Sequence, residues 1–444
     1  MISRTTVDPL FRTASAQSPA RTLASSLFFA AVVLLPFQQA LTINVGFPLK
    51  LSEIFAIAAM LLMVLEFQRG RYRLVGFPLV LLFLALIVLS SIIVAATTPA
   101  ASVAPGYWRS LNADLWQYTV YAAFVVSVFY VAATRIGARR IQIALAIAVK
   151  VAAAYCVLQI VAHSVGSDLL STVNGATQTG GAYGVQLPRN GPFLEGNYLG
   201  FFAGAVLLIT WALKDRLSQV ASVFCLLYSQ STIGILALVL AILTIAIIRP
   251  NNRVFALVAA LIAVTIGGYL LVPQANAFVL QQLAKLSLVD SGASVAASYS
   301  IRARSVNSEV GISMATAHPI WGVGAGRYGA LYFQFLDFAK VPFGFAKGVE
   351  RPIANNSYVQ IMAEQGFLAF TVFAAFLTRV AWAMRKAGRS DIAALVFFLV
   401  GFAATPAWTT LPIWIFLAYL ATKAFEAEQG LAVSARPLRE GARE

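Results

Sequence analysis

Charged and amide side chains gather in a few short stretches of an otherwise apolar sequence. The first stretch, LPRNGPFLEGNYLG, places Arg189, Glu195 and Asn197 where an apolar segment begins. If that segment crosses a membrane, a charge at its edge costs about 2.5 to 3.5 kcal/mol and normally faces a partner or a water-filled cavity. Two interpretations stay open: an ion pair that anchors the end of a helix, or a cationic site with a carboxylate beside it.

The second stretch, YSIRARSVNSEV, contains Arg302 and Arg304. A guanidinium group binds phosphate oxygens in a bidentate manner and stays charged at any pH, so arginine is suited to anchor a pyrophosphate. In a helix, side chains two residues apart diverge by about 200°, whereas in an extended segment they share a face. The pair could also belong to a solvated loop, or to one that contacts lipid headgroups.

His318 precedes the glycine-rich run HPIWGVGAGRYG. This histidine is either the polar anchor of a turn or an acid/base group. The run contains GxGxxG, but a dinucleotide site needs a strand before the motif and a helix after it, within a βαβ unit. We reject that interpretation and expect the glycines to form a tight turn that lets the backbone approach a ligand.

The third polar stretch, NNSYVQIMAEQG, contains Asn355, Asn356, Gln360 and Glu364. The last three are spaced i, i+4, i+8, so on a helix they share one face. A polar stripe that ends in a carboxylate is costly to expose to lipid. It should line a cavity or cross-link helices, and we favour the cavity.

The elements that position these residues are predicted to be membrane helices. Hydrophobic residues make up 60% and charged residues 11% of the 444 positions, with a mean hydropathy of +0.80, which excludes an ordinary soluble protein. We predict an all-α, polytopic membrane protein with about twelve helices, because each span needs about 20 apolar residues. The predicted centres lie near Ala31, Met60, Ala85, Phe124, Ala152, Ala205, Phe224, Leu240, Val264, Val372, Leu399 and Phe416.

The distribution of basic residues predicts which side of the membrane each connection faces. Most of the 32 Lys and Arg fall in the terminal segments and in alternate connections, which the positive-inside rule assigns to the cytoplasm together with both termini. The net charge of +15 therefore indicates topology, and we expect no nucleic-acid partner. We predict a single transmembrane domain over 1–444, with a cytoplasmic arm (1–22), a large periplasmic loop (273–354) and a cytoplasmic tail (424–444). Lys150, in the middle of a predicted span, is expected to snorkel to the interface.

The motifs together resemble the superfamily of O-antigen ligases and Wzy-type O-antigen and exopolysaccharide polymerases. The resemblance covers most of the chain and rests on the order of FPLKLSEIFAIAAML, FLEGNYLGFF, YSQSTIG, RAR, HPIWGVGAG and NNSYVQIMAEQG. It implies a fold of the GT-C type and an inverting, metal-independent glycosyl transfer from undecaprenyl-pyrophosphate-linked glycans, with no cofactor. Arg189, Arg302 and Arg304 would then neutralise the leaving pyrophosphate, and Asn197, Asn355, Asn356 and Gln360 would contact substrate.

One position departs from the ligase pattern, in which a His, then Asn, Ser or Gln, is followed by nine residues and Gly. Here the run is Asn355, Asn356, nine residues and Gly366. Asparagine cannot accept the proton of an acceptor hydroxyl, so Glu195, His318 and Glu364 remain as candidates for that role.

We therefore expect a polysaccharide polymerase of the bacterial inner membrane, with membrane lipids around it and a chain-length regulator as the usual partner of such relatives. A ligase that transfers polymer to lipid A core or protein, a shape-and-division peptidoglycan polymerase, and a glycolipid flippase or exporter remain as alternatives.

Overall fold

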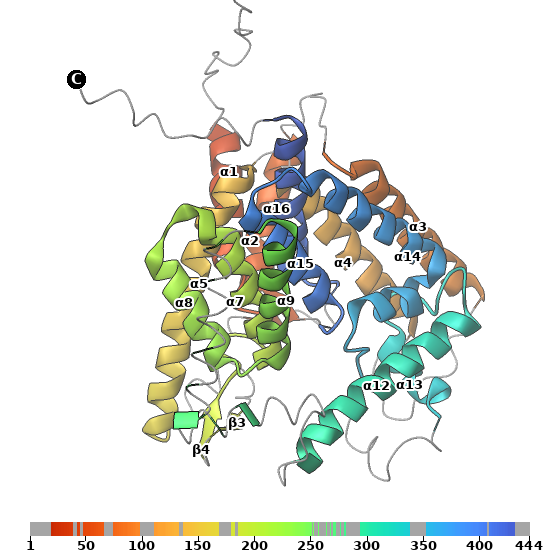
Figure 1. The fold of residues 1–444 in the computed structure, drawn as a ribbon. Helices are drawn as coiled ribbons and strands as arrows, with labels where there is room; N and C mark the ends of the chain where they lie inside the picture. Colours follow the sequence, from red (N-terminus) through yellow and green to blue (C-terminus); the bar gives the residue numbers. More distant parts are fainter. Residues whose placement is uncertain are drawn as a thin grey trace, which may run out of the picture.

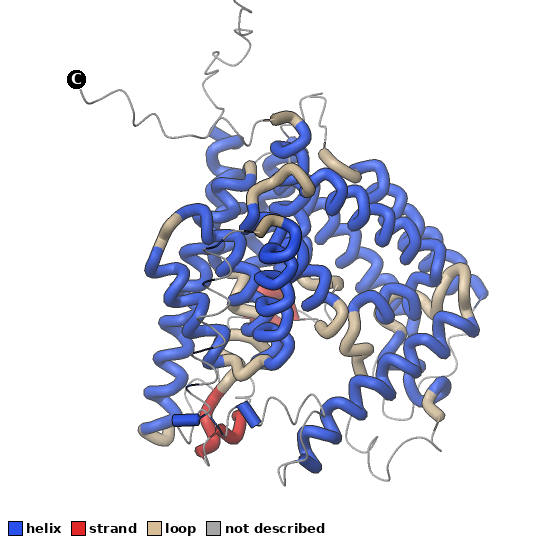
Figure 2. The backbone as a smooth tube through the Cα atoms, viewed as in Figure 1, coloured by secondary structure: helices blue, strands red, loops and turns tan. Residues whose placement is uncertain are grey.

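The computed structural model is mostly helical (Figures 1 and 2). It describes residues 19–38, 42–44, 48–65, 74–97, 111–132, 136–167, 179–182, 185–250, 294–337, 352–405 and 408–430, together with isolated positions between 252 and 280.

Two short antiparallel hairpins accompany the helices. They are formed by β1 (Thr42–Asn44) with β2 (Pro48–Lys50), and by β3 (Thr179–Ala182) with β4 (Val185–Pro188). The helices are α1 (Pro19–Val33), α2 (Leu51–Leu65), α3 (Phe77–Thr97), α4 (Leu111–Val131), α5 (Ala138–Ser164), α7 (Gly196–Thr210), η3 (Trp211–Leu213, a 3₁₀ turn), α8 (Arg216–Tyr228), α9 (Thr232–Ile248), α12 (Ser294–Ala317), α13 (Tyr328–Phe335), α14 (Ser357–Met384), α15 (Arg389–Phe402) and α16 (Leu411–Glu428).

The helix α16 is embedded among the other helices. Its sequence is apolar on all sides, which is the pattern of a fully buried helix, and residues 411–422 are all buried. The Trp414 ring lies 5.7 Å from Phe129 of α4, 6.4 Å from Phe83 of α3 and 6.5 Å from Phe373 of α14. These aromatic contacts tie α3, α4, α14 and α16 into one core.

The observed helices agree with the predicted class but do not establish twelve spans. Each predicted centre falls within a helix except Val264, which lies outside the described residues. Among the described helices, four are long and apolar enough to cross a membrane: Phe77–Thr97, Ala138–Ser164, Gly196–Leu213 and Ser357–Met384. Shorter apolar helices cover Thr22–Val33, Leu51–Met63, Leu115–Val131, Arg216–Tyr228 and Thr232–Ile248. The number of spans thus stays a prediction.

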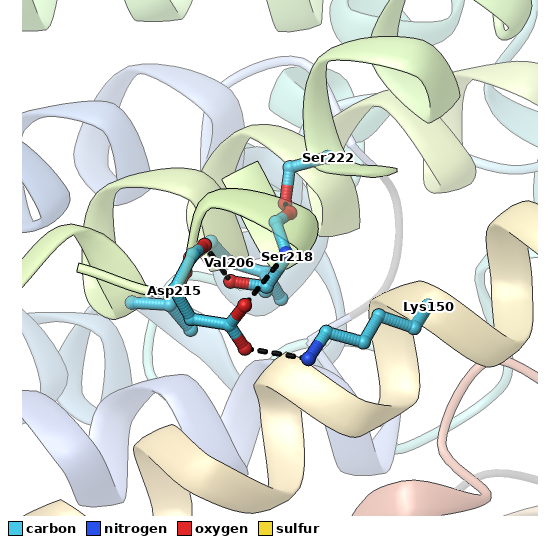
Figure 3. Close-up of polar contacts among 6 residues, drawn as sticks. Lys150, Val206, Asp215, Ser218 and Ser222 are labelled. Atoms are coloured by element: carbon cyan, nitrogen blue, oxygen red, sulfur yellow. Dashed lines mark hydrogen bonds and ion pairs between the residues drawn. The ribbon is translucent and has the colours of Figure 1, made fainter. Parts of the chain in front are cut away.

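Lys150 of α5 is held by an ion pair with α8, which the sequence did not predict. Its Nζ lies 2.5 Å from Oδ2 of Asp215, the N-cap residue of α8, and the other carboxylate oxygen accepts a hydrogen bond from the Ser218 backbone (Figure 3). The hydrogen bond from Lys150 is the largest cause that lowers the pKa of Asp215 below its ordinary value. The lysine is paired within the protein, so snorkelling is not needed to explain it.

The predicted periplasmic loop contains helices of its own, α12 and α13, which lie beside the first half of α14 (Figure 1). At the other end of the chain, α16 continues to Glu428, five residues into the segment predicted as a tail. The rest of that tail, from residue 431, lies outside the described residues.

Candidate functional site

Arg189 and Glu195 lie at the first turn of α7. Arg189 follows strand β4, and Glu195 is the N-cap residue of α7 with extended backbone angles. A Cβ atom built on Gly196 would lie 2.6 Å from Arg189 Nε and 2.6 Å from the Ser229 carbonyl oxygen. Only glycine therefore lets this guanidinium lie across the start of α7, and Arg189 Nε is buried with no hydrogen-bond partner in the described part of the chain.

The turn YSQSTIG, between α8 and α9, packs against the start of α7. Gln230 adopts a left-handed conformation with φ +50° and is buried, and the Ser231 hydroxyl caps α9 by accepting from the Gly234 backbone. A Cβ on Gly200 would lie 2.4 Å from Ser231 Cβ. Small residues thus let the N-terminal ends of α7 and α9 approach closely.

Arg304 of α12, more than 100 residues further along the chain, interacts electrostatically with Arg189 and Glu195, and we call these three residues the arginine cluster. All three side chains are half-buried. Burial lowers the pKa of the Arg189 guanidinium, Glu195 opposes this effect, and the charge of Arg304 adds to the lowering. Burial likewise lowers the pKa of Arg304, and Glu195 again opposes it. The site thus combines two guanidinium groups with one carboxylate, and its excess positive charge suits an anionic ligand.

Asn197 and Arg302 are the remaining candidate residues of the first two polar stretches. Asn197 is half-buried in the first turn of α7. The segment of Arg302 and Arg304 is helical, which decides between the two open geometries, because positions two apart on a helix do not share a face. The side chain of Arg302 lies outside the described part of the structure.

Asn355 and Asn356 shape the start of α14. Asn355 has φ +56°, a left-handed conformation in which Asn and His are both enriched among residues other than glycine. The same backbone would therefore accept the histidine of the ligase pattern. Oδ1 of Asn356 accepts from the backbone of Tyr358 and Val359, so this oxygen caps the helix and is not available to a ligand.

The predicted polar stripe on α14 exists, and it cross-links helices. Gln360 Nε2 donates to one oxygen of Glu364 at 3.3 Å, and Trp408 Nε1, from the connection between α15 and α16, donates to the other at 3.3 Å. Glu364 is only 1% exposed. Both carboxylate oxygens therefore accept hydrogen bonds from other side chains of the protein. This favours the cross-linking alternative over the predicted cavity.

The glycine run after His318 holds a break in α14. Gly366 interrupts that helix with φ +77°, and a Cβ there would lie 2.2 Å from the Ile320 carbonyl oxygen. The carbonyl oxygens of Ala363 and Glu364 accept hydrogen bonds from the backbone of residues 323 and 324. The close approach predicted from these glycines is real, but its partner is the backbone of α14 and not a ligand.

Positions along α12 give the distances from Arg304 to the start of α14 and to His318. A Cβ on Gly311 would lie 2.4 Å from Val359, so α12 contacts the start of α14 about 10 Å along its axis from Arg304. His318 lies at the far end, about 21 Å from Arg304 along the helix axis. It is exposed and packs edge-on against Phe335, with ring centroids 6.1 Å apart. His318 is therefore not part of the arginine cluster.

Two buried charged features escaped the sequence analysis. Arg327, directly after the glycine run, is fully buried. Glu53 of α2 is 1% exposed and accepts hydrogen bonds from Lys50 Nζ, at 3.1 Å, and from the Tyr121 hydroxyl. The Lys50–Glu53 pair could have been recognised from the sequence, because the two residues stand three apart at the start of an apolar segment.

Residues 217–374 match the family model described as O-antigen ligase. The chain carries an O-antigen ligase domain. No curated protein matches the chain.

The O-antigen ligase domain confirms the resemblance predicted from the motifs. It covers α8, α9, α12 and α13 and the first part of α14, and thereby Arg304, His318 and the polar stripe of α14. Arg189 and Glu195 precede the matched segment. Members of this family are membrane enzymes of the glycosyltransferase type, ligases and polymerases, and the match together with the apolar helices supports a membrane protein with a function of that type.

Proposed function

We propose that the protein is a bacterial polysaccharide polymerase of the inner membrane. It joins repeat units carried on undecaprenyl pyrophosphate at the periplasmic face, by an inverting transfer that does not require a metal. The observation that supports this proposal is that the charges of Arg189, Arg304 and Glu195 act on one another although they come from segments far apart in sequence. Two guanidinium groups match the charge of a pyrophosphate that leaves from a sugar.

The reaction is a single displacement at the anomeric carbon of the donor sugar. The oxygen of an acceptor hydroxyl forms the new C–O bond, the bond to the pyrophosphate oxygen breaks, and its electron pair leaves with the pyrophosphate. Arg189 and Arg304 stabilise the negative charge that develops on that leaving group.

Glu195 is the residue that we assign to the hydroxyl proton. It is half-buried and its charge acts on both arginines, whereas Glu364 is enclosed by Gln360 and Trp408. His318 lies about 21 Å from Arg304 along α12. A carboxylate that faces the acceptor hydroxyl, on the side of the donor sugar opposite the leaving group, can accept the proton as the new bond forms and return it to solvent.

Further contacts to the glycan are proposed at the edge of this cluster. Asn197 in the first turn of α7, and Asn355 and Gln360 at the start of α14, carry amide groups that can bind sugar hydroxyls. Arg302 would contact the carrier or its lipid surroundings. A chain-length regulator is the partner that we expect for a polymerase of this kind.

The test uses purified protein and lipid-linked repeat units from its own host, without nucleotide sugar. We expect a ladder of products longer than one repeat, read on a gel. Arg189→Ala and Arg304→Ala should shorten or abolish the ladder, and the matched control Arg140→Ala, which removes an exposed arginine at the start of α5, should not. Normal chain lengths from both cluster variants would contradict the proposal.

A ligase is the second candidate, because the matched family model carries that description. The same assay separates the two functions. A ligase would make no ladder, but would transfer preformed polymer once a lipid A core or protein acceptor is added. Transfer under neither condition would favour a flippase or exporter.

A further inference from the structure

A pocket lies next to Glu195 and is not explained by the arginine cluster. Leu194 and Tyr198, on either side of Glu195 in the sequence, both line it. Other lining residues come from β2 and from the connection into α16, among them Lys50 and Thr410.

The pocket combines aromatic walls with a few polar groups. Phe193 and Phe202 pack with ring centroids 5.4 Å apart and form part of the wall, while Gln38, Lys50 and Thr410 supply an amide, an ammonium and a hydroxyl. This mixture is typical of small-molecule sites, in which apolar surface binds the body of a ligand and sparse polar groups orient it. A sugar ring presents both kinds of surface, since its C–H faces are apolar and its hydroxyls donate and accept hydrogen bonds.

Lys50 is fixed in place by partners of its own. Its Nζ lies 3.1 Å from Glu53 Oε1 and 5.9 Å from the centre of the Tyr121 ring, and its backbone N–H donates to the other Glu53 oxygen at 3.0 Å. An ammonium has three donors, and Glu53 accepts one of them. The pairing with Glu53 also balances its charge, so a neutral ligand suits the pocket as well as an anionic one.

One side of the pocket is accessible. Much of its wall comes from α7 and from the start of α16, the helix enclosed by the others, whereas Leu194, which also lines it, is 52% exposed. A ligand can therefore reach the pocket past Leu194.

We propose that this pocket binds the sugar of the acceptor chain whose hydroxyl attacks the donor. This inference rests on the proposed function and adds to it the place of the second substrate. Donor pyrophosphate at Arg189 and Arg304, and acceptor sugar at Lys50 and Tyr198, then meet at Glu195. The hydroxyl proton passes to Glu195 while the acceptor oxygen forms its bond to the donor carbon.

The test measures binding of a water-soluble probe, the lipid-free repeat-unit oligosaccharide released from the host polysaccharide by mild acid. Saturation-transfer NMR with the full-length protein should detect binding. Leu194→Trp narrows the entrance at an exposed position and should weaken binding at least tenfold. The double variant Lys50→Met/Glu53→Gln removes the ammonium without leaving a buried unpaired carboxylate, and it should weaken binding too. Leu217→Trp, at a residue 65% exposed on α8, is the matched control and should bind as wild type does.

Absence of binding by the wild-type protein would overturn the inference, as would unchanged binding by both pocket variants. Arg189→Ala should keep the binding, because it alters the donor site. If the probe binds in a pocket-dependent manner but no chain extension occurs, the pocket stands and the polymerase proposal fails. If Leu194→Trp extends chains with an unchanged KM for the acceptor, the polymerase stands and the pocket inference fails.

Discussion

The substitution Gly196→Ala tests whether the approach of Arg189 to the start of α7 matters for activity. The added methyl would lie 2.6 Å from both Arg189 Nε and the Ser229 carbonyl oxygen, and 2.9 Å from the Arg189 carbonyl oxygen. Ordinary contacts of this kind need more than about 3.2 Å, so the groups must separate by about half an ångström or more. Two of the three atoms are backbone, and the guanidinium is the part that can move.

The magnitude follows from the overpacking. Gly196 is the first residue of α7, so the preference for alanine within helix interiors gives little compensation. Overpacking costs about 1 to 3 kcal/mol, and part of that cost remains because the two backbone oxygens cannot move with the guanidinium. A displacement of up to about 1 Å at a reacting centre can cost about a hundredfold in rate. We expect a lowered melting temperature, in a protein that is still folded at the assay temperature, and a rate of chain extension about 10 to 100 times lower.

The assay is the initial rate of the product ladder, with thermal unfolding of the same preparation. Gly267→Ala is the matched control, because no described atom lies within 4 Å of a Cβ at that helical position. It should keep full activity. Wild-type rates from Gly196→Ala would refute the idea that the position of Arg189 controls the reaction.

Three further predictions concern stability. Gly366→Ala, at a φ of +77° in the break of α14, should prevent accumulation of folded protein, measured by its yield after gel filtration. Trp408→Phe removes a donor to the buried Glu364 and should lower stability by about 1 to 3 kcal/mol in thermal unfolding, with chain extension retained. The pKa of Asp215 is lowered in the folded state, so its stabilisation is complete above the unfolded value of about 3.9 and is lost as the pH falls through the folded value. Asp215→Asn keeps a capping residue but loses the ion pair with Lys150. Its free energy of unfolding at neutral pH should fall by less than about 1 kcal/mol, because both partners are partly exposed. Its melting temperature should vary less than that of the wild type between pH 3 and 7.

The sequence by itself determined the class of protein and the family. Apolar runs long enough to span a bilayer have few alternatives to helices, since lipid offers no partner for free backbone groups. For the same reason the predicted centres fall in helices wherever the structure describes them. The order of the short motifs was sufficient to recognise the family. YSQSTIG, HPIWGVGAG and NNSYVQIMAEQG each make a tight backbone contact that few residue types permit, so their residues can be recognised in the sequence.

The tertiary structure decided how the polar residues are grouped. Arg304 and Glu195 stand far apart in sequence, and only the fold lets the charge of Glu195 act on Arg304. Local spacing correctly placed Gln360 and Glu364 on one face of a helix, but it could not supply Trp408, the partner that makes this stripe a cross-link. Periodicity along one helix fixes which side chains share a face, whereas what that face meets depends on contacts between distant segments.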